Sequence, residues 1–262
     1  MQRWTVACVA IGVSLAACQN VPSAGQGGSS PASEGTQPVS QATQRAKIFT
    51  DLGAAYFQRG QFKVALDEVR KAIASDSDYG PAYDILGLIY MDLTEDELAE
   101  ENFHKAVELD HSDSAAHNNY GWFLCSRGRY DEGLSQFTAA LRNPLYATPE
   151  EALVNAGRCN EQKGDMQKAE ASFIKAMKLQ PDYPLALISM ARLKFKQDNL
   201  AEADRFLVRY HSVATATPES LWLGVRIERK LGNKDQETAY ATQLHKGFPD
   251  SREDSQLMSG QY

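Results

Sequence analysis

The sequence repeats a unit of 34 residues along most of its length. Small residues return at three positions of this unit, at Gly53, Gly87, Gly121 and Gly157, at Ala65, Ala99, Gly133 and Ala169, and at Ala72, Ala106, Ala140 and Ala176. Copies begin near residues 46, 80, 114, 150, 184 and 218, and only the third step, of 36 residues, departs from the period. A unit this short cannot bury an apolar face by itself, so the copies must stack into one array.

The unit matches the tetratricopeptide pattern, in which L-G-x2-Y is followed by Ala, Phe, Ala and Pro. Repeats of this pattern are pairs of antiparallel helices, and their small residues lie where the two helices approach most closely. Aromatic side chains are expected between neighbouring pairs, here Tyr90, Phe103, Phe137 and Phe173. The sequence therefore predicts an all-α, right-handed superhelical solenoid of six tetratricopeptide (TPR) repeats over residues 45–250.

Two parts of the chain depart from the regular pattern. The longer third step contains Pro144 and Pro149, which we expect to end one helix and to start the next. The sixth copy is weak, with Glu237 where a small residue belongs, as is typical of a terminal repeat with a polar outer face. Residues 251–262 show no clear periodicity, and we expect this tail to fray.

The N-terminus has the layout of a secretory signal peptide, with a basic start and a short apolar run. It ends in Leu15-Ala16-Ala17-Cys18, which resembles the lipobox of bacterial lipoproteins. This resemblance implies a signal peptide over residues 1–17 and acyl chains on Cys18, and the alternative is an ordinary cleavage site. The Gly-, Ser- and Pro-rich residues 18–44 are expected to form a flexible tether. In the lipoproteins that this motif resembles, an aspartate directly after the cysteine tends to hold the protein at the inner membrane. This chain has Gln19 there, so the resemblance implies a lipid anchor in the outer membrane that faces the periplasm.

Composition and motifs argue against catalysis. The net charge of −7 disfavours a nucleic-acid partner, whose phosphates require a basic surface. The five histidines show no metal-ligand spacing, and neither a phosphate-binding loop nor a catalytic motif is present. We therefore predict a protein that is not an enzyme and that binds other proteins, with no cofactor, metal or small-molecule substrate.

In TPR proteins, a fixed set of positions on the first helix of each repeat tends to face the concave, partner-binding groove. The residues at these positions are Phe57, Leu88, Met91, Asn118, Trp122, Arg158, Ile188, Arg192, Phe195, Lys196, Trp222, Arg226 and Arg229. The predicted groove is apolar in its N-terminal half and basic in its C-terminal half, which suits a partner segment with an apolar and an acidic part. The alternative is that some of these residues only pack between repeats. The clamp that grips C-terminal carboxylates in chaperone-binding arrays is incomplete, because Asn119 and Asn155 occupy one of its positions while the Lys and Asn of the other two are absent.

Two cysteines, Cys125 and Cys159, lie in the predicted first helices of adjacent repeats. Neighbouring first helices pack side by side, which allows a Cα separation suitable for a disulfide. The periplasm is oxidising, so a pair of cysteines there favours a bridge. The alternative is two buried free thiols.

The middle of the chain resembles one particular family more closely than a generic TPR protein. The run N-N-Y-G-W-F-L-C over residues 118–125, the insertion P-L-Y-A-T-P over residues 144–149 and N-A-G-R-C over residues 155–159 resemble the type IV pilus biogenesis lipoproteins, which are TPR pilotins. The resemblance implies a protein that binds subunits of the outer-membrane secretin and promotes their localisation and multimerisation, as pilus assembly and twitching motility require. The alternative is a periplasmic adaptor of another envelope machine, for cell-wall hydrolases or barrel assembly.

Overall fold

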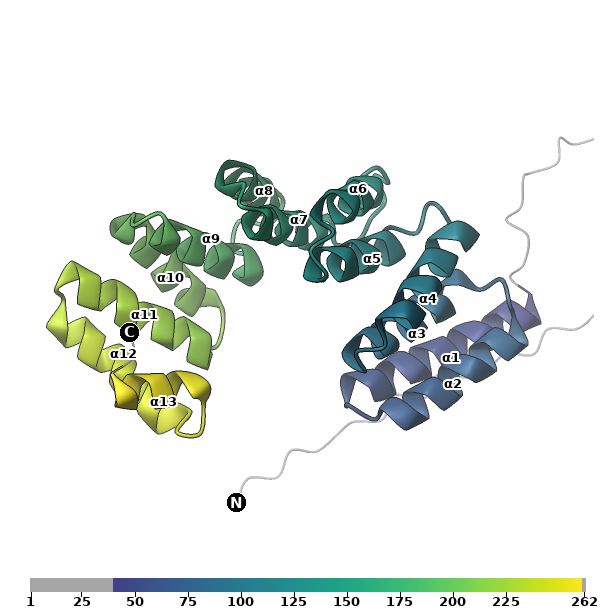
Figure 1. Ribbon diagram of the computed structural model, residues 1–262, viewed down its shortest axis with the longest axis horizontal. Helices are drawn as coiled ribbons and strands as arrows, with labels where there is room; N and C mark the ends of the chain where they lie inside the picture. Colours follow the sequence, from purple (N-terminus) through teal and green to yellow (C-terminus); the bar gives the residue numbers. More distant parts are fainter. Residues whose placement is uncertain (1–39, 261–262) are drawn as a thin grey trace, which may run out of the picture. The chain divides into compact units, whose positions relative to one another are not determined.

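The structure, a computed structural model, describes residues 40–260. The predicted signal peptide, Cys18 and most of the predicted tether lie outside the described residues. Thirteen helices and no strand are found between residues 40 and 260 (Figure 1). They are α1 (Gln41–Gln58), α2 (Phe62–Ser75), α3 (Gly80–Asp92), α4 (Asp96–Leu109), α5 (Ser114–Ser126), α6 (Tyr130–Ala140), α7 (Pro149–Lys163), α8 (Met166–Leu179), α9 (Pro184–Lys196), α10 (Leu200–Val213), α11 (Pro218–Leu231), α12 (Lys234–Gly247) and α13 (Arg252–Ser259).

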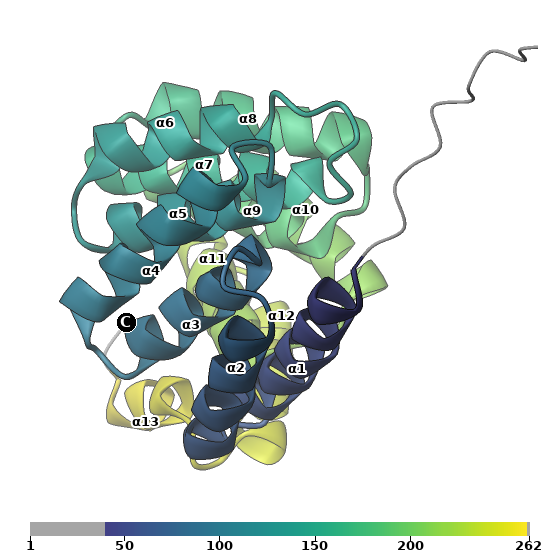
Figure 2. The same cartoon turned by 90° about the vertical axis from the view of Figure 1, so that its right-hand side faces the viewer.

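The first twelve helices form six pairs, from α1 with α2 to α11 with α12, and each pair packs on the next (Figures 1 and 2). The first helices of successive pairs also contact one another directly, from α1 with α3 to α9 with α11. This arrangement confirms the predicted all-α fold of stacked TPR repeats. The helices α3, α5, α7, α9 and α11 begin within one residue of the repeat starts read from the sequence.

The first helix begins earlier than the sequence pattern indicates. Helix α1 starts at Gln41, so the four residues from Gln41 that were expected to belong to the tether are helical. The hydroxyl of Ser40 accepts a hydrogen bond from the backbone N–H of Thr43 at 3.0 Å, which caps the helix. The predicted boundary at residue 44 is therefore wrong by one turn.

Within a repeat, the glycine of the first helix makes room for the aromatic ring of the second. A Cβ atom on Gly87 would lie 2.7 Å from the ring of Phe103, and one on Gly121 would lie 2.9 Å from the ring of Phe137. Gly157 and Phe173 form the same pair in the fourth repeat. Such short approaches leave no room for a side chain, so glycine allows the two helices to close on the ring.

The connection between the third and fourth repeats differs from the others. Helix α6 has 11 residues, whereas the other second helices have 14, and residues 141–148 link it to α7. Pro149 is the first residue of α7, as expected. The expectation for Pro144 is wrong, because α6 already ends at Ala140. The structure joins Cys125 of α5 to Cys159 of α7 by a disulfide beside this link, with 5.6 Å between their Cα atoms.

The C-terminal residues form a helix, so the prediction of a frayed tail is wrong. Ser251 caps α13 by accepting a hydrogen bond from the N–H of Asp254 at 3.1 Å. The Asp254 side chain is buried, and its two carboxylate oxygens lie 3.1 Å from Nδ1 of His245 on α12. Leu257 packs against the apolar cluster of the last two repeats. These contacts with α11 and α12 stabilise α13, although its own sequence shows no helical periodicity.

Candidate functional site

Polar side chains join successive first helices in the N-terminal half of the array. Counted from the repeat starts, Asp84 and Asn118 are fifth residues, whereas Asn119 and Asn155 are sixth residues. Nδ2 of Asn119 donates to Oδ2 of Asp84 at 2.8 Å, and Nδ2 of Asn155 donates to Oδ1 of Asn118 at 3.1 Å. Asn118 is only 3% exposed, so it links α5 to α7 rather than offering a free side chain to the groove.

Asp84 is a buried carboxylic acid whose environment changes its acidity. Its Oδ1 is buried and has no hydrogen-bond partner. Burial raises the pKa of Asp84 to about 7, and the charge of Asp113 adds to this increase, while the hydrogen bond from Asn119 opposes it. Near neutral pH the array therefore contains a carboxyl group close to its titration midpoint.

Asp84 should make the array less stable as the pH rises. Between the unfolded pKa of about 3.8 and the folded pKa of about 7, the folded chain keeps a proton that the unfolded chain has lost. Stability therefore falls with pH across this window, by on the order of 4 kcal/mol for this one group. In Asp84→Asn this loss should disappear, as urea unfolding at several pH values would measure. Asp92→Asn, at an exposed position of the same helix, is the control, and parallel pH profiles for Asp84→Asn and wild type would contradict the assignment.

The predicted apolar half of the groove is partly used for packing. The rings of Phe57 and Phe62 lie 6.1 Å apart at the end of the first repeat, and Phe57 packs half-buried against the cluster of α1–α3. Leu88 and Met91 are half-buried against the next cluster, around Phe103. These three candidates therefore belong to two packing clusters of the first repeats.

Trp122 and Arg158 come together across the irregular joint. The guanidinium carbon of Arg158, on α7, lies 4.8 Å from the ring centroid of Trp122, on α5. Both side chains are half-buried, and Trp122 packs against the cluster that contains the two cysteines. Burial lowers the pKa of Arg158, and the nearby charge of Arg192 lowers it further. A cation is thus held over an aromatic face next to a second cation.

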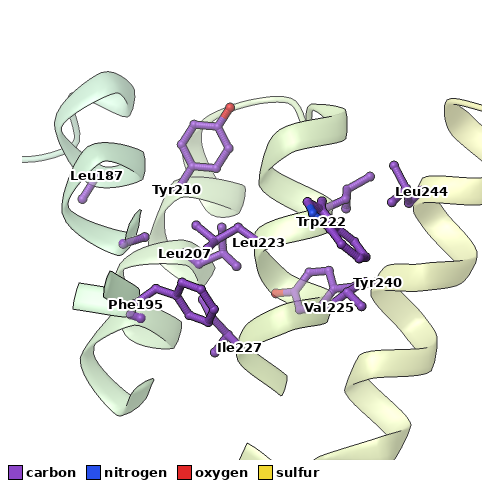
Figure 3. Close-up of a cluster of buried hydrophobic side chains, with 13 residues drawn as sticks. Leu187, Phe195, Leu207, Tyr210, Trp222, Leu223, Val225, Ile227, Tyr240 and Leu244 are labelled. Atoms are coloured by element: carbon purple, nitrogen blue, oxygen red, sulfur yellow. The ribbon is translucent and has the colours of Figure 1, made fainter. Parts of the chain in front are cut away.

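Six of the seven remaining candidates line a cavity of about 530 Å³ between α9 and α11. The groove candidates from the sequence that line this cavity are Ile188, Arg192, Phe195, Lys196, Trp222 and Arg226. Phe195 and Trp222 are 9% and 8% exposed, because they also belong to the buried cluster of the last two repeats (Figure 3). Arg229 does not line this cavity, and its Nε donates instead to Glu237 of α12 at 2.7 Å.

The sequence patterns missed three carboxylates in this part of the array. Glu161 is buried beside Arg192 and Lys196, while Glu219 and Glu253 line the cavity between α9 and α11. Glu161 is the twelfth residue of its repeat, a position that tends to face the groove. Its repeat position could therefore have identified it as a groove residue. Glu253 belongs to α13, which the repeat pattern does not cover.

From residue 40 to residue 260, no three His, Cys, Asp or Glu side chains gather into a group that could hold a metal ion. None of the helices in that range combines the length and the apolar run needed to cross a membrane.

Known proteins resemble this chain in sequence. A family model described as tetratricopeptide repeat matches residues 86–143 and 124–184. The chain is 28% identical over 205 residues to the type IV pilus assembly protein PilF of Pseudomonas aeruginosa, and this match covers 78% of the chain and 81% of the relative.

Two solved structures extend the similarity to the fold. PilW, described as a widely conserved type IV pilus biogenesis factor, is 32% identical with a TM-score of 0.75, over 82% of this chain and 99% of PilW. The structure of Pseudomonas aeruginosa PilF is 26% identical with a TM-score of 0.73, over 85% of this chain and 100% of PilF. The resemblance seen in the sequence is thereby confirmed, and the chain belongs to the family of TPR proteins for type IV pilus biogenesis.

Proposed function

We propose that this protein is an outer-membrane lipoprotein that acts as a pilotin for the type IV pilus secretin. The observation that carries the proposal is the match to PilW, a type IV pilus biogenesis factor, over 99% of that chain. The lipobox-like Leu15-Ala16-Ala17-Cys18 supports a lipid anchor that faces the periplasm. The cavity on the first helices of the last repeats supports a binding role, because TPR arrays act through such surfaces.

The proposed mechanism follows from the chemistry of the cargo. A secretin subunit that has not yet assembled exposes apolar surface intended for the bilayer or for its neighbours, and such surface aggregates in water. The TPR surface covers part of it, while acyl chains on Cys18 hold the complex at the membrane. Delivery to the outer membrane then raises the local concentration of subunits, which favours their multimerisation.

Deleting the gene should leave the secretin monomeric or away from the outer membrane. Membrane fractionation, followed by immunoblotting of unheated samples for the secretin multimer, would measure both. The wild-type gene should restore the multimer, whereas Cys18→Ser should fail to restore its outer-membrane location. Normal multimers in the outer membrane of the deletion strain would refute the proposal. Cross-linked recovery of a hydrolase or of barrel-assembly components, without secretin, would instead support the adaptor alternative.

A further inference from the structure

Three arginines occupy the same position in the last three repeats. Arg158, Arg192 and Arg226 are each the ninth residue of their repeat and are spaced by 34 residues. They lie on α7, α9 and α11, which contact one another in that order. Arg158 and Arg192 line one cavity, and Arg192 and Arg226 line the next. The stacking of equivalent repeats therefore places one guanidinium group per repeat along the array.

Aromatic rings support the two outer arginines. The guanidinium carbon of Arg158 lies 4.8 Å from the ring centroid of Trp122, and that of Arg226 lies 4.6 Å from the ring centroid of Phe195. A guanidinium group held over an aromatic ring still has N–H groups that can donate to a carboxylate. No carboxylate in residues 40–260 lies within the 4.0 Å ion-pair distance of either arginine. The rings thus hold Arg158 and Arg226 in place, and no carboxylate of the described residues pairs with their N–H groups.

The middle of the row has more cations than anions. Glu161 is the shared partner of Lys196, at 2.6 Å, and of Arg192, at 3.5 Å. These three residues and Arg158 line a second cavity, of about 270 Å³. It shares Arg192 and Lys196 with the 530 Å³ cavity. We call the two cavities together the arginine trough. Its lining residues are Arg158, Glu161, Gln162, Ile188, Arg192, Phe195, Lys196, Glu219, Trp222, Leu223, Arg226, Lys230 and Glu253.

The charge of the trough opposes that of the whole chain. Five cationic side chains line it against three carboxylates, although the chain has a net charge of −7. One of the five, Lys230, is paired with Asp198 at 2.7 Å, which leaves four cations for the three carboxylates. Like charges held close together in a partly buried site repel one another, and an incoming carboxylate relieves that repulsion. The trough therefore suits an anionic ligand better than the rest of the surface does.

The larger cavity also has an apolar wall. The cavity is lined by Ile188, Phe195, Trp222 and Leu223 as well as by Arg192 and Arg226. Phe195 and Trp222 are fixed by the buried cluster behind them (Figure 3), so the cavity exists before a ligand arrives. Its volume of about 530 Å³ lies in the range of small binding pockets and can accept a large apolar side chain.

We propose that the arginine trough binds an acidic segment of a partner protein, whose carboxylates pair with Arg158, Arg192 and Arg226 and whose large apolar side chain enters the cavity between α9 and α11. A peptide fits better than a uniform polyanion, because Glu161, Glu219 and Glu253 repel negative charge at points along the trough. The inference rests on the proposed function only for the identity of the partner, a secretin subunit.

A labelled synthetic peptide of alternating glutamate and phenylalanine tests the proposal. Fluorescence anisotropy with the full-length protein in mild detergent should show binding that weakens as salt is added. Arg226→Gln should weaken binding about tenfold or more, because it removes a charge-assisted, bidentate contact. Arg226→Lys should weaken it as well, because an ammonium lacks the planar fork. Arg205→Gln, at an exposed position on α10, is the matched control and should change affinity by less than about twofold.

Several outcomes would overturn the proposal. Equal binding of a peptide with glutamine in place of glutamate would show that charge is not recognised. Equal losses in Arg226→Gln and Arg205→Gln would show that the trough is not the site. Binding to phosphatidylglycerol vesicles through Arg226, without binding of the peptide, would make the trough a lipid site. If Arg226→Gln does not fold, Arg158→Gln at the other end of the row replaces it.

The same variants separate the two proposals in cells. Loss of peptide binding in Arg226→Gln together with normal secretin multimers would support the acidic-segment site and assign it to another partner. Normal multimers in the deletion strain would refute the pilotin role, and peptide binding would still decide whether the trough recognises acidic segments.

Discussion

Replacing Phe173 with alanine should lower the free energy of unfolding by about 3 to 5 kcal/mol. The Phe173 side chain is fully buried on α8, against Gly157 of α7. The same cluster contains Met190 and Leu193 of α9, so the ring joins the fourth repeat to the fifth. Its removal leaves a cavity at an interface between repeats, where the neighbours cannot collapse fully because Gly157 has no side chain to contribute.

The adjacent Ile174 supplies a matched control. It lies on the same helix, and its side chain is 40% exposed, so Ile174→Ala should cost about 1 kcal/mol or less. Urea unfolding followed by circular dichroism would measure both variants. Equal losses for Phe173→Ala and Ile174→Ala would contradict the packing described here. A second, separate unfolding transition in Phe173→Ala alone would show that the repeats before and after this interface had uncoupled.

The sequence was sufficient to predict the stacked pairs because many positions report the same period. Each glycine-to-aromatic pair, such as Gly87 with Phe103, recurs one repeat later and therefore reinforces the alignment. Helix α13 has no such support, since an eight-residue segment occurs once and depends on long-range contacts such as Asp254 with His245. The early end of α6 was also missed, because Ala140 still fits the repeat pattern although the helix ends there.

The candidate site was predictable to the extent that repeat position sets the face of a helix. This rule located Arg192, Phe195, Trp222 and Arg226, which the structure brings to one cavity. The position of a residue in its repeat does not predict which neighbouring side chain will bind it. Asn118 is hydrogen-bonded by Asn155 of the next repeat, and Arg229 donates to Glu237 of the paired helix. Such contacts depend on which residue type occupies the neighbouring position, and the repeat pattern does not specify that residue type.

Replacing both Cys125 and Cys159 with alanine should lower the free energy of unfolding by about 3 to 4 kcal/mol, the loop-closure entropy expected for a bridge over 34 residues. Both side chains are buried, and alanine fits each site without adding a polar group. A reductant should destabilise the wild type and leave the double variant unchanged, which is the internal control. Wild type and double variant with equal stability, both insensitive to reductant, would mean that the thiols are free.

The bridge has a further consequence because of its place in the array. It joins α5 to α7 across the irregular link, and Arg158 directly precedes Cys159 while Trp122 lies one turn before Cys125. The disulfide thus fixes the two helices whose side chains form the stack at one end of the arginine trough. The double variant should therefore also bind the acidic peptide more weakly under conditions where it remains folded. Anisotropy titrations at low temperature, with the reduced wild type alongside, would measure this effect, and unchanged affinity in both would show that the stack does not depend on the bridge.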